Sequence, residues 1–100
     1  FIILISKATI PLDNLVYITA DDHYLEYYIE GNAKPQIDRN SLKNALKQLP
    51  LKSFVQIHRS SVVNLNFAKA VYGDRLLLSN GEYLKLSRKY RKELKRLLQV

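Results

Sequence analysis

The chain has 100 residues and a formal net charge of +7 at pH 7, which suits a single domain with enough length to bury a core. It contains no cysteine, so disulfides and cysteine-based metal sites are excluded, and its two histidines have no partner at a metal-binding spacing. The apolar run at residues 1–5 is too short to span a membrane, and no basic stretch precedes it as in a signal peptide. Because the first residue is Phe1 and not methionine, we expect a piece of a longer protein.

The positive charge is concentrated at the carboxyl end. Residues 85–100 carry +6 of the net +7, and residues 1–84 carry only +1. Such asymmetry favours a polyanionic partner, with nucleic acid first and an anionic membrane surface second.

The first half of the chain predicts strands joined by tight turns. Strands are expected at residues 1–6, 15–20, 24–30 and 34–38, with turns at 7–9, 21–23 and 31–32. In the third strand, Leu25, Tyr27 and Ile29 share one face. Pro35 confines the fourth strand to a sheet edge or makes it the start of that strand.

A short helix is predicted at residues 42–49. Leu42, Ala45, Leu46 and Leu49 repeat at the i, i+3, i+4, i+7 spacing of one helix face. Asn40 or Ser41 is the expected N-cap, and Pro50 ends the helix.

The stretch at residues 54–66 (FVQIHRSSVVNLN) is unusual for a core strand because it is apolar at both ends and polar in the middle. We expect both ends to be anchored in the core and the centre, around Arg59, to be held at the surface. A cation held on a stiff support loses little freedom on binding, which is how a binding site is preorganised.

The last third predicts more hairpin strands and a final helix. Strands are expected at 68–72, 75–79 and 82–86, with turns at Gly73-Asp74 and Asn80-Gly81, the second as a type I′ pair. Ser87 is the expected cap of a helix at residues 88–98. Tyr90, Leu94, Leu97 and Leu98 form its apolar stripe, and its basic residues are expected on the other side. The fold class is therefore mostly β, antiparallel, with two helices at about 42–49 and 88–98.

Arg59 is the first candidate for binding. An exposed arginine commonly pairs with a carboxylate or covers apolar neighbours with its stem. Here no acidic residue lies within a dozen positions on either side, and His58, Ser60 and Ser61 beside it are all potential donors. His58 itself is better explained as a structural residue that orients a neighbour, and the serines either contact phosphate or cap the turn.

Arg88 and Lys89 fall in the first turn of the final helix, where cations are unfavourable because the helix N-terminus is partially positive. Two cations there suggest a compensating anion, and the alternative is a solvated basic face, which is common. An enzyme is not supported, since the chain has no cysteine nucleophile, glycine-rich phosphate loop or zinc-protease motif, and no third member completes a triad with His58 and Ser60.

Three stretches together resemble the LytTR-type DNA-binding domain of bacterial transcription regulators. They are LVYITADDHYLEYYI (15–29), FVQIHRSSVVNL (54–65) and NGEYLKLSRKYRKEL (80–94). The order and spacing of the HRSxxVN and SRxY elements carry the resemblance, which spans nearly the whole chain. Thr19, Gln56 and Lys85 depart from the family pattern, which usually has Glu, Arg and Pro at these positions.

The resemblance implies an elongated β fold whose loops, together with the start of the last helix, enter successive major grooves of duplex DNA. Base contacts carried over from the family fall on Arg59, on Arg88 and on either His23 or Tyr24. The implied phosphate contacts are Ser60, Lys85, Lys89, Arg91 and Lys92. No cofactor and no metal ion are implied.

The resemblance also implies a cellular context. The expected protein is a cytoplasmic response regulator in which residues 1–100 form the DNA-binding domain and a receiver domain lies upstream. Other family members join this domain to membrane segments, so a different upstream part is the open alternative. It is expected to bind direct-repeat promoter sites as a homodimer. Two other classes stay open from the residues alone: an RNA- or single-strand-binding β module that stacks bases on exposed tyrosines such as Tyr24 and Tyr28, and a protein-interaction domain whose basic helix only solubilises it.

Overall fold

The computed structural model describes residues 2–5 and 8–98 and contains ten strands, two α-helices and two 3₁₀ turns within them. The strands are β1 (Ile2–Ile5), β2 (Ala8–Pro11), β3 (Leu15–Asp21), β4 (Tyr24–Ile29), β5 (Gln36–Arg39), β6 (Phe54–His58), β7 (Ser61–Asn64), β8 (Ala68–Tyr72), β9 (Arg75–Leu78) and β10 (Tyr83–Lys85). The helices are α1 (Leu42–Leu46) and α2 (Arg88–Leu98), and the 3₁₀ turns are η1 (Leu12–Asn14) and η2 (Leu65–Phe67).

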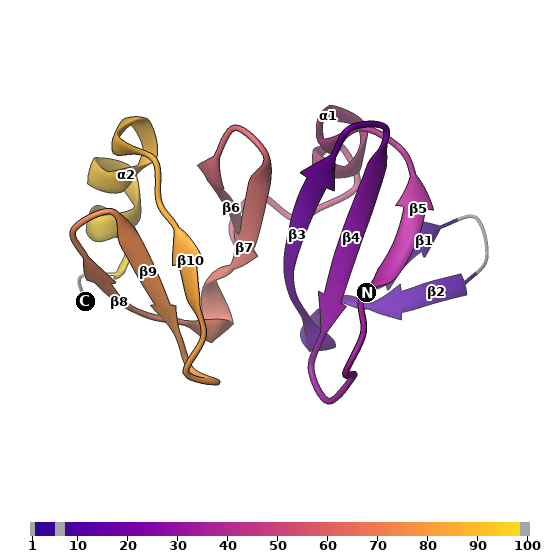
Figure 1. Ribbon diagram of the computed structural model, residues 1–100, viewed down its shortest axis with the longest axis horizontal. Helices are drawn as coiled ribbons and strands as arrows, with labels where there is room; N and C mark the ends of the chain where they lie inside the picture. Colours follow the sequence, from indigo (N-terminus) through magenta and orange to yellow (C-terminus); the bar gives the residue numbers. More distant parts are fainter. Residues whose placement is uncertain (1, 6–7, 99–100) are drawn as a thin grey trace.

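All strand pairings are antiparallel, as predicted, and they form three sheets. The central sheet has the order β5-β4-β3-β7-β6, and it lies between a β1-β2 hairpin and a second sheet of order β10-β9-β8 (Figure 1). The molecule is elongated, with a longest dimension of 36 Å against 25 and 23 Å. The mostly β class with two helices is therefore confirmed.

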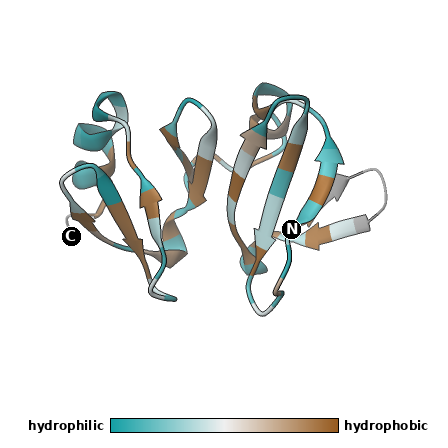
Figure 2. Cartoon of the chain, viewed as in Figure 1, coloured by the Kyte–Doolittle hydropathy of each residue, from teal (hydrophilic) through white to brown (hydrophobic). Residues whose placement is uncertain are grey.

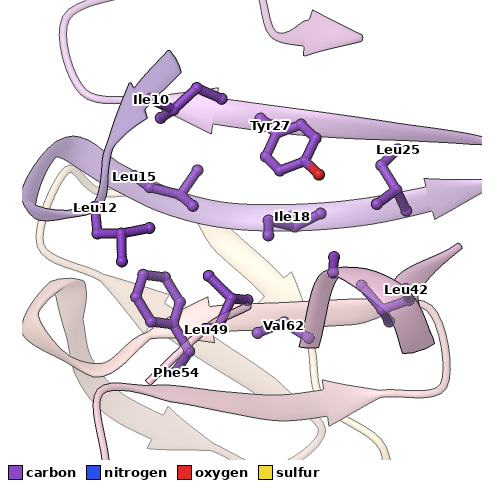
Figure 3. Packing of buried hydrophobic residues seen from close by; sticks show 11 residues of the cluster. Ile10, Leu12, Leu15, Ile18, Leu25, Tyr27, Leu42, Leu49, Phe54 and Val62 are labelled. Carbon is purple, nitrogen blue, oxygen red and sulfur yellow. The ribbon is translucent and has the colours of Figure 1, made fainter. Parts of the chain in front are cut away.

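The central sheet is buried on both faces. Leu15 and Ile18 of β3 pack with Val62 of β7 in one core, closed by α1, β2 and η1 (Figure 3). Tyr17 and Val63, which alternate with them along the same strands, pack in a second core with the β8–β10 sheet and α2. Burial on two faces explains why adjacent residues of these strands, Tyr17 and Ile18 on β3 and Val62 and Val63 on β7, are both apolar or aromatic. On β4, which lies next to the edge strand β5, buried and more exposed residues alternate instead (Figure 2).

Helix α2 is held by its apolar stripe, as predicted. Leu94 is fully buried in the second core, and Tyr90 and Leu98 pack at its margin. The prediction is wrong for Arg91, which is half-buried and has its Nε enclosed without a hydrogen-bond partner. At 100° per residue, Arg91 stands only about 20° from Leu98 around the helix, so it borders the apolar stripe instead of opposing it.

Several predicted boundaries change in the structure. The first helix ends at Leu46 and not at Leu49, although Ser41 caps it as expected by accepting a hydrogen bond from the Asn44 N–H at 3.2 Å. Strand β5 begins after Pro35, at one edge of the central sheet, because proline cannot donate to a ladder. Residues 1, 6 and 7 of the first predicted strand and turn lie outside the described residues.

The expected type I′ pair at Asn80-Gly81 is wrong. Gly81 has φ +92°, but Asn80 does not share the positive φ that type I′ requires at both central residues. Instead, the Gly81 N–H donates to the Leu78 carbonyl at 3.0 Å, and the Leu78 N–H donates to the Glu82 carbonyl at 2.8 Å. This is the longer hairpin connection in which a glycine in the left-handed region follows an ordinary turn.

Because Tyr27 is buried, we expect the stability of the fold to depend on pH in alkaline solution. Burial, with a smaller contribution from the nearby Asp38 carboxylate, raises the pKa of Tyr27 to about 12. The folded-state pKa of Tyr27 lies above the unfolded value of about 10. The contribution of the protonated Tyr27 to the free energy of unfolding is therefore complete below pH 10 and is lost as the pH rises toward 12. At pH 11 the free energy of unfolding should have fallen by roughly 1.4 kcal/mol through Tyr27 alone.

Denaturant unfolding at pH 8 and pH 11 measures this loss. Tyr27→Phe should lose less stability over that interval than the wild type, whereas Tyr72→Phe, which alters an exposed ring, should behave as the wild type does. Equal losses in both variants would contradict the assignment to Tyr27.

Candidate nucleic-acid interface

Three chain segments singled out in the sequence lie along one edge of the molecule. They are the β3–β4 turn, the β6–β7 turn and the start of α2, all at the upper edge in Figure 1. Backbone hydrogen bonds fix both outer segments to the central hairpin. The Ala20 N–H donates to the Ser60 carbonyl, and the Ser87 N–H donates to the Ile57 carbonyl, each at 2.8 Å. The fold therefore joins residues that are far apart in the sequence into one surface.

The β6–β7 hairpin has the character predicted for residues 54–66. Phe54 and Ile57 of β6 are buried, as are Val62 and Val63 of β7, whereas Arg59 at the turn is exposed. The apolar ends thus anchor the hairpin in the two cores, and the turn is carried between them at the surface.

Side-chain hydrogen bonds stiffen this turn from within. His58 Nδ1 accepts the Ser60 N–H at 3.2 Å and lies 2.9 Å from the Ser60 hydroxyl. Because a backbone N–H can only donate, Nδ1 is the unprotonated nitrogen, and this network assigns the ring proton of neutral His58 to Nε2. The expectation that His58 orients a neighbour is confirmed.

Gln56 has a role that was not predicted from the sequence. Its side-chain amide Nε2 donates to the His58 carbonyl at 3.1 Å and lies 3.5 Å from the Arg59 carbonyl. A Gln shortly before a turn has no distinctive sequence signal, so only the folded structure reveals this contact.

At the far end of the hairpin, the buried Asn64 caps η2. Its side chain accepts a hydrogen bond from the Asn66 N–H at 3.0 Å, which confirms Asn64 as a turn former.

The β3–β4 turn presents two candidate residues in different settings. Asp22 occupies the left-handed region (φ 57°), and the His23 side chain beside it is 72% exposed, with Nε2 3.6 Å from Asp22 Oδ1. Tyr24 is 47% exposed but already belongs to β4, opposite Arg39 of β5. His23 therefore stands at the tip of the turn, and Tyr24 lies on the flank of the sheet.

The start of α2 carries cations with few partners. Arg88, Lys89 and Lys92 are exposed, as is Lys85 at the end of β10. Lys89 Nζ lies 5.4 Å from the Tyr90 ring centroid. Within residues 2–5 and 8–98, the ion pair on this helix joins Arg96 to Glu93, and the guanidinium lowers the pKa of the Glu93 carboxyl. Arg59 and Arg88 have no ion pair in the described part of the chain, so both keep their charge available.

Tyr24 and Tyr28 bear on whether the chain could stack the bases of RNA or of a single strand. Tyr28 stacks on Tyr17, with ring centroids 4.3 Å apart, and its hydroxyl donates to Glu26 Oε1 at 3.0 Å. Of the two tyrosines proposed as a stacking platform, Tyr24 is exposed and Tyr28 is packed.

Thr19, one of the departures from the family pattern, has a structural role. Its Oγ1 donates at 3.2 Å to Glu26 Oε1, the oxygen that also accepts from Tyr28.

No three His, Cys, Asp or Glu side chains of the described residues form a group that could hold a metal ion. None of the described helices has both the length and the apolar character needed to cross a membrane.

Comparisons with known proteins agree with this geometry. A family model described as the LytTr DNA-binding domain matches residues 6–99. The solved LytTr DNA-binding domain of a response regulator from Bacillus cereus matches with a TM-score of 0.76 at 28% identity, over 100% of this chain and 96% of that chain.

Matches to curated proteins cover a smaller part of longer chains. An uncharacterized response regulatory protein of Vibrio cholerae is 43% identical over 58 residues, which is 56% of this chain and 22% of that protein. The sensory transduction protein LytT of Bacillus subtilis is 37% identical over 59 residues, or 54% of this chain and 24% of that protein. LytT of Bacillus anthracis is 26% identical over 106 residues, or 94% of this chain and 43% of that protein. The chain spans less than half the length of these relatives.

Proposed function

The chain belongs to the LytTr DNA-binding domain family, and we propose that residues 1–100 are the sequence-specific DNA-binding domain of a bacterial transcription regulator. The observation that carries the proposal is the shared edge on which the β3–β4 turn, the β6–β7 turn and the start of α2 are tied together by backbone hydrogen bonds. The family is one of DNA-binding domains and not of enzymes.

The base-reading residues are Arg59, Arg88 and His23. A guanidinium suits guanine, whose O6 and N7 accept a bidentate pair in the major groove. Of the two candidates in the β3–β4 turn, we assign His23 to the groove because it stands at the exposed tip, whereas Tyr24 lies in β4.

The phosphate contacts are Ser60, Lys85, Lys89, Arg91 and Lys92. Such contacts fix the register of the protein on the duplex and carry no sequence information of their own. The Ser60 hydroxyl, which lies 2.9 Å from His58 Nδ1, must turn away from the ring to donate to a phosphate, and Arg91, whose Nε is enclosed, must donate through its Nη groups.

The cellular context follows from the longer relatives. We propose that the chain is the output domain of a cytoplasmic two-component response regulator, with a receiver domain upstream, and that it binds direct-repeat promoter sites as a homodimer. The second candidate is an RNA- or single-strand-binding module, which the exposed Tyr24 alone favours.

Selection of bound duplexes from a random pool tests the proposal. We expect a motif with guanines at two fixed positions and a binding constant that falls steeply with salt. Recovery of no motif, or competition by single-stranded RNA at equal concentration, would move the function to the second candidate.

Gln56→Leu should weaken binding to the selected duplex about two- to tenfold, the range of one lost hydrogen bond of 0.5–1.5 kcal/mol. The substitution removes the amide that holds the carbonyls of the Arg59 turn, so Arg59 loses more freedom on binding. Titration of a labelled duplex measures the loss. Gln48→Leu, on the exposed turn after α1, is the matched control and should bind as the wild type does. Equal affinity for both variants would show that the turn needs no such support.

A further inference from the structure

Two surfaces of opposite charge lie toward opposite ends of the molecule. The first, which we call the acidic surface, surrounds a shallow depression of about 280 Å³ on β3, β4 and β5 that is lined by Asp21, Tyr24, Glu26 and Ile37. The second, the basic hollow, has a volume of about 320 Å³ between β8 and α2 and is lined by Lys69, Ala70, Val71, Lys95 and Leu98. Strands β5 and β8 lie toward opposite ends of the long axis in Figure 1.

The acidic surface combines exposed apolar side chains with fixed carboxylates. Ile37 is 57% exposed on the edge strand β5, and Tyr24 lies beside it on β4. Glu26, opposite Ile37 in register, is held in place by two hydroxyl donors. Asp21 lines the same depression, whereas Arg39 is the neighbouring cation, so carboxylates outnumber guanidinium groups.

The basic hollow has the complementary composition. Lys69 on β8 and Lys95 on α2 are exposed, and neither has an ion pair within residues 2–5 and 8–98. Between them, Val71 and Leu98 are half-buried apolar side chains. A partner suited to this hollow therefore carries an apolar side chain flanked by carboxylates, which the chain itself presents around Ile37.

We propose that the acidic surface of one copy of this chain docks in the basic hollow of the next, in a head-to-tail contact. Ile37 enters the hollow against Val71 and Leu98, and the carboxylates meet the two lysines. Because the two surfaces differ, the contact is heterologous and leaves one of each kind free at the ends of a pair.

The contact is small, and contacts of this size are weak between free proteins. On adjacent DNA sites, however, the effective local concentration of the second copy is high, so the same contact appears as cooperative binding. The expected cooperativity on DNA, unlike the contact itself, rests on the proposed function. It also gives Tyr24 a place in the protein contact, which leaves His23 to the DNA.

Disulfide trapping tests the contact without DNA, and the chain suits it because it has no cysteine. Ile37→Cys is mixed with Ala70→Cys under mild oxidation, and mass spectrometry separates mixed from like pairs. We expect the mixed pair to form faster than a pair of Leu51→Cys with Ala70→Cys, because the contact raises the local concentration of the two thiols. Leu51 is 75% exposed and lies in neither surface, so equal rates would overturn the proposal.

Cooperativity on DNA is the second test. On duplexes with two selected sites in tandem, the wild type should bind the second site about tenfold more tightly than a single site. Ile37→Lys should lose this factor and keep single-site affinity, whereas Leu51→Lys, with the same change in charge, should keep both. A tandem factor near one for the wild type would overturn the proposal, whereas failure to bind any single site would refute the proposed function and leave the trapping result to decide the contact.

Discussion

Leu94→Ala is expected to lower the free energy of unfolding by about 2–5 kcal/mol, the range for a leucine removed from a packed core. Leu94 is fully buried, and it packs in the second core together with Ile57 of β6 and Leu86, the residue that leads into α2. The cavity left by the substitution lies between the helix and the sheet. The surrounding strands are tied by hydrogen bonds and collapse only partly, so most of the cost remains.

Thermal unfolding followed by far-UV circular dichroism measures this loss, and the midpoint should fall by roughly 10 °C or more for a domain of this size. Leu51→Ala removes the same atoms from a side chain that is 75% exposed and should stay within about 0.5 kcal/mol of the wild type. A Leu94→Ala midpoint within error of the wild type would show that the apolar stripe does not anchor α2. The same substitution also tests the interface, because the position of Arg88 depends on that helix.

Arg59→Ala is expected to weaken binding to the selected DNA site by about 1–3 kcal/mol and to abolish the base preference at one position. The physical reason is the support beneath the side chain. The turn that carries Arg59 is anchored by buried residues on both sides and stiffened by His58 and Gln56, so the guanidinium is presented with little backbone freedom. Within the described residues it has no carboxylate to leave before binding.

Binding constants for the selected duplex and for duplexes changed at single positions measure both effects. Arg88→Ala should lose the preference at a different position, since its helix start lies on the other side of the hairpin from the β3–β4 turn. Lys92→Ala is the matched control: it should weaken all duplexes alike and reduce the salt slope by about one unit. If Arg59→Ala also weakened all duplexes equally, Arg59 would belong with the phosphate contacts.

Helix α2 combines two tasks that constrain its sequence. One face must fill the second core, and the other must keep cations near the shared edge. Arg91 lies where the two faces meet, with a half-buried side chain and an enclosed Nε. At this border the aliphatic part of a charged side chain can pack while its charged end stays near the surface.

Local patterns of residues were enough to predict most of the helices and strands and the family. Alternation predicted β4, the leucine spacing and Ser41 predicted α1, and the apolar stripe predicted α2, because these patterns depend only on neighbours in the chain. Arg59 was singled out as a cation without a local acidic partner, and Arg88 as a cation in the first turn of the last helix, where the partial positive charge disfavours it. Errors arose where a contact decided the conformation: α1 ends early, Gly81 alone carries the positive φ in its turn, and Arg91 is partly enclosed.

The contacts between distant residues could not be predicted from local patterns and became visible in the folded chain. Adjacent apolar residues of β3 and β7 pack in different cores, and periodicity alone cannot assign such neighbours to two cores. The amide of Gln56 on the carbonyls of the Arg59 turn, and the choice of His23 over Tyr24 for the tip, depend on register and turn geometry. The shared edge itself depends on two backbone hydrogen bonds, Ala20 to Ser60 and Ser87 to Ile57, between residues thirty or more positions apart. Contacts of that kind form because a buried backbone group left without a partner is costly, and no local pattern of residues specifies which partner each one finds.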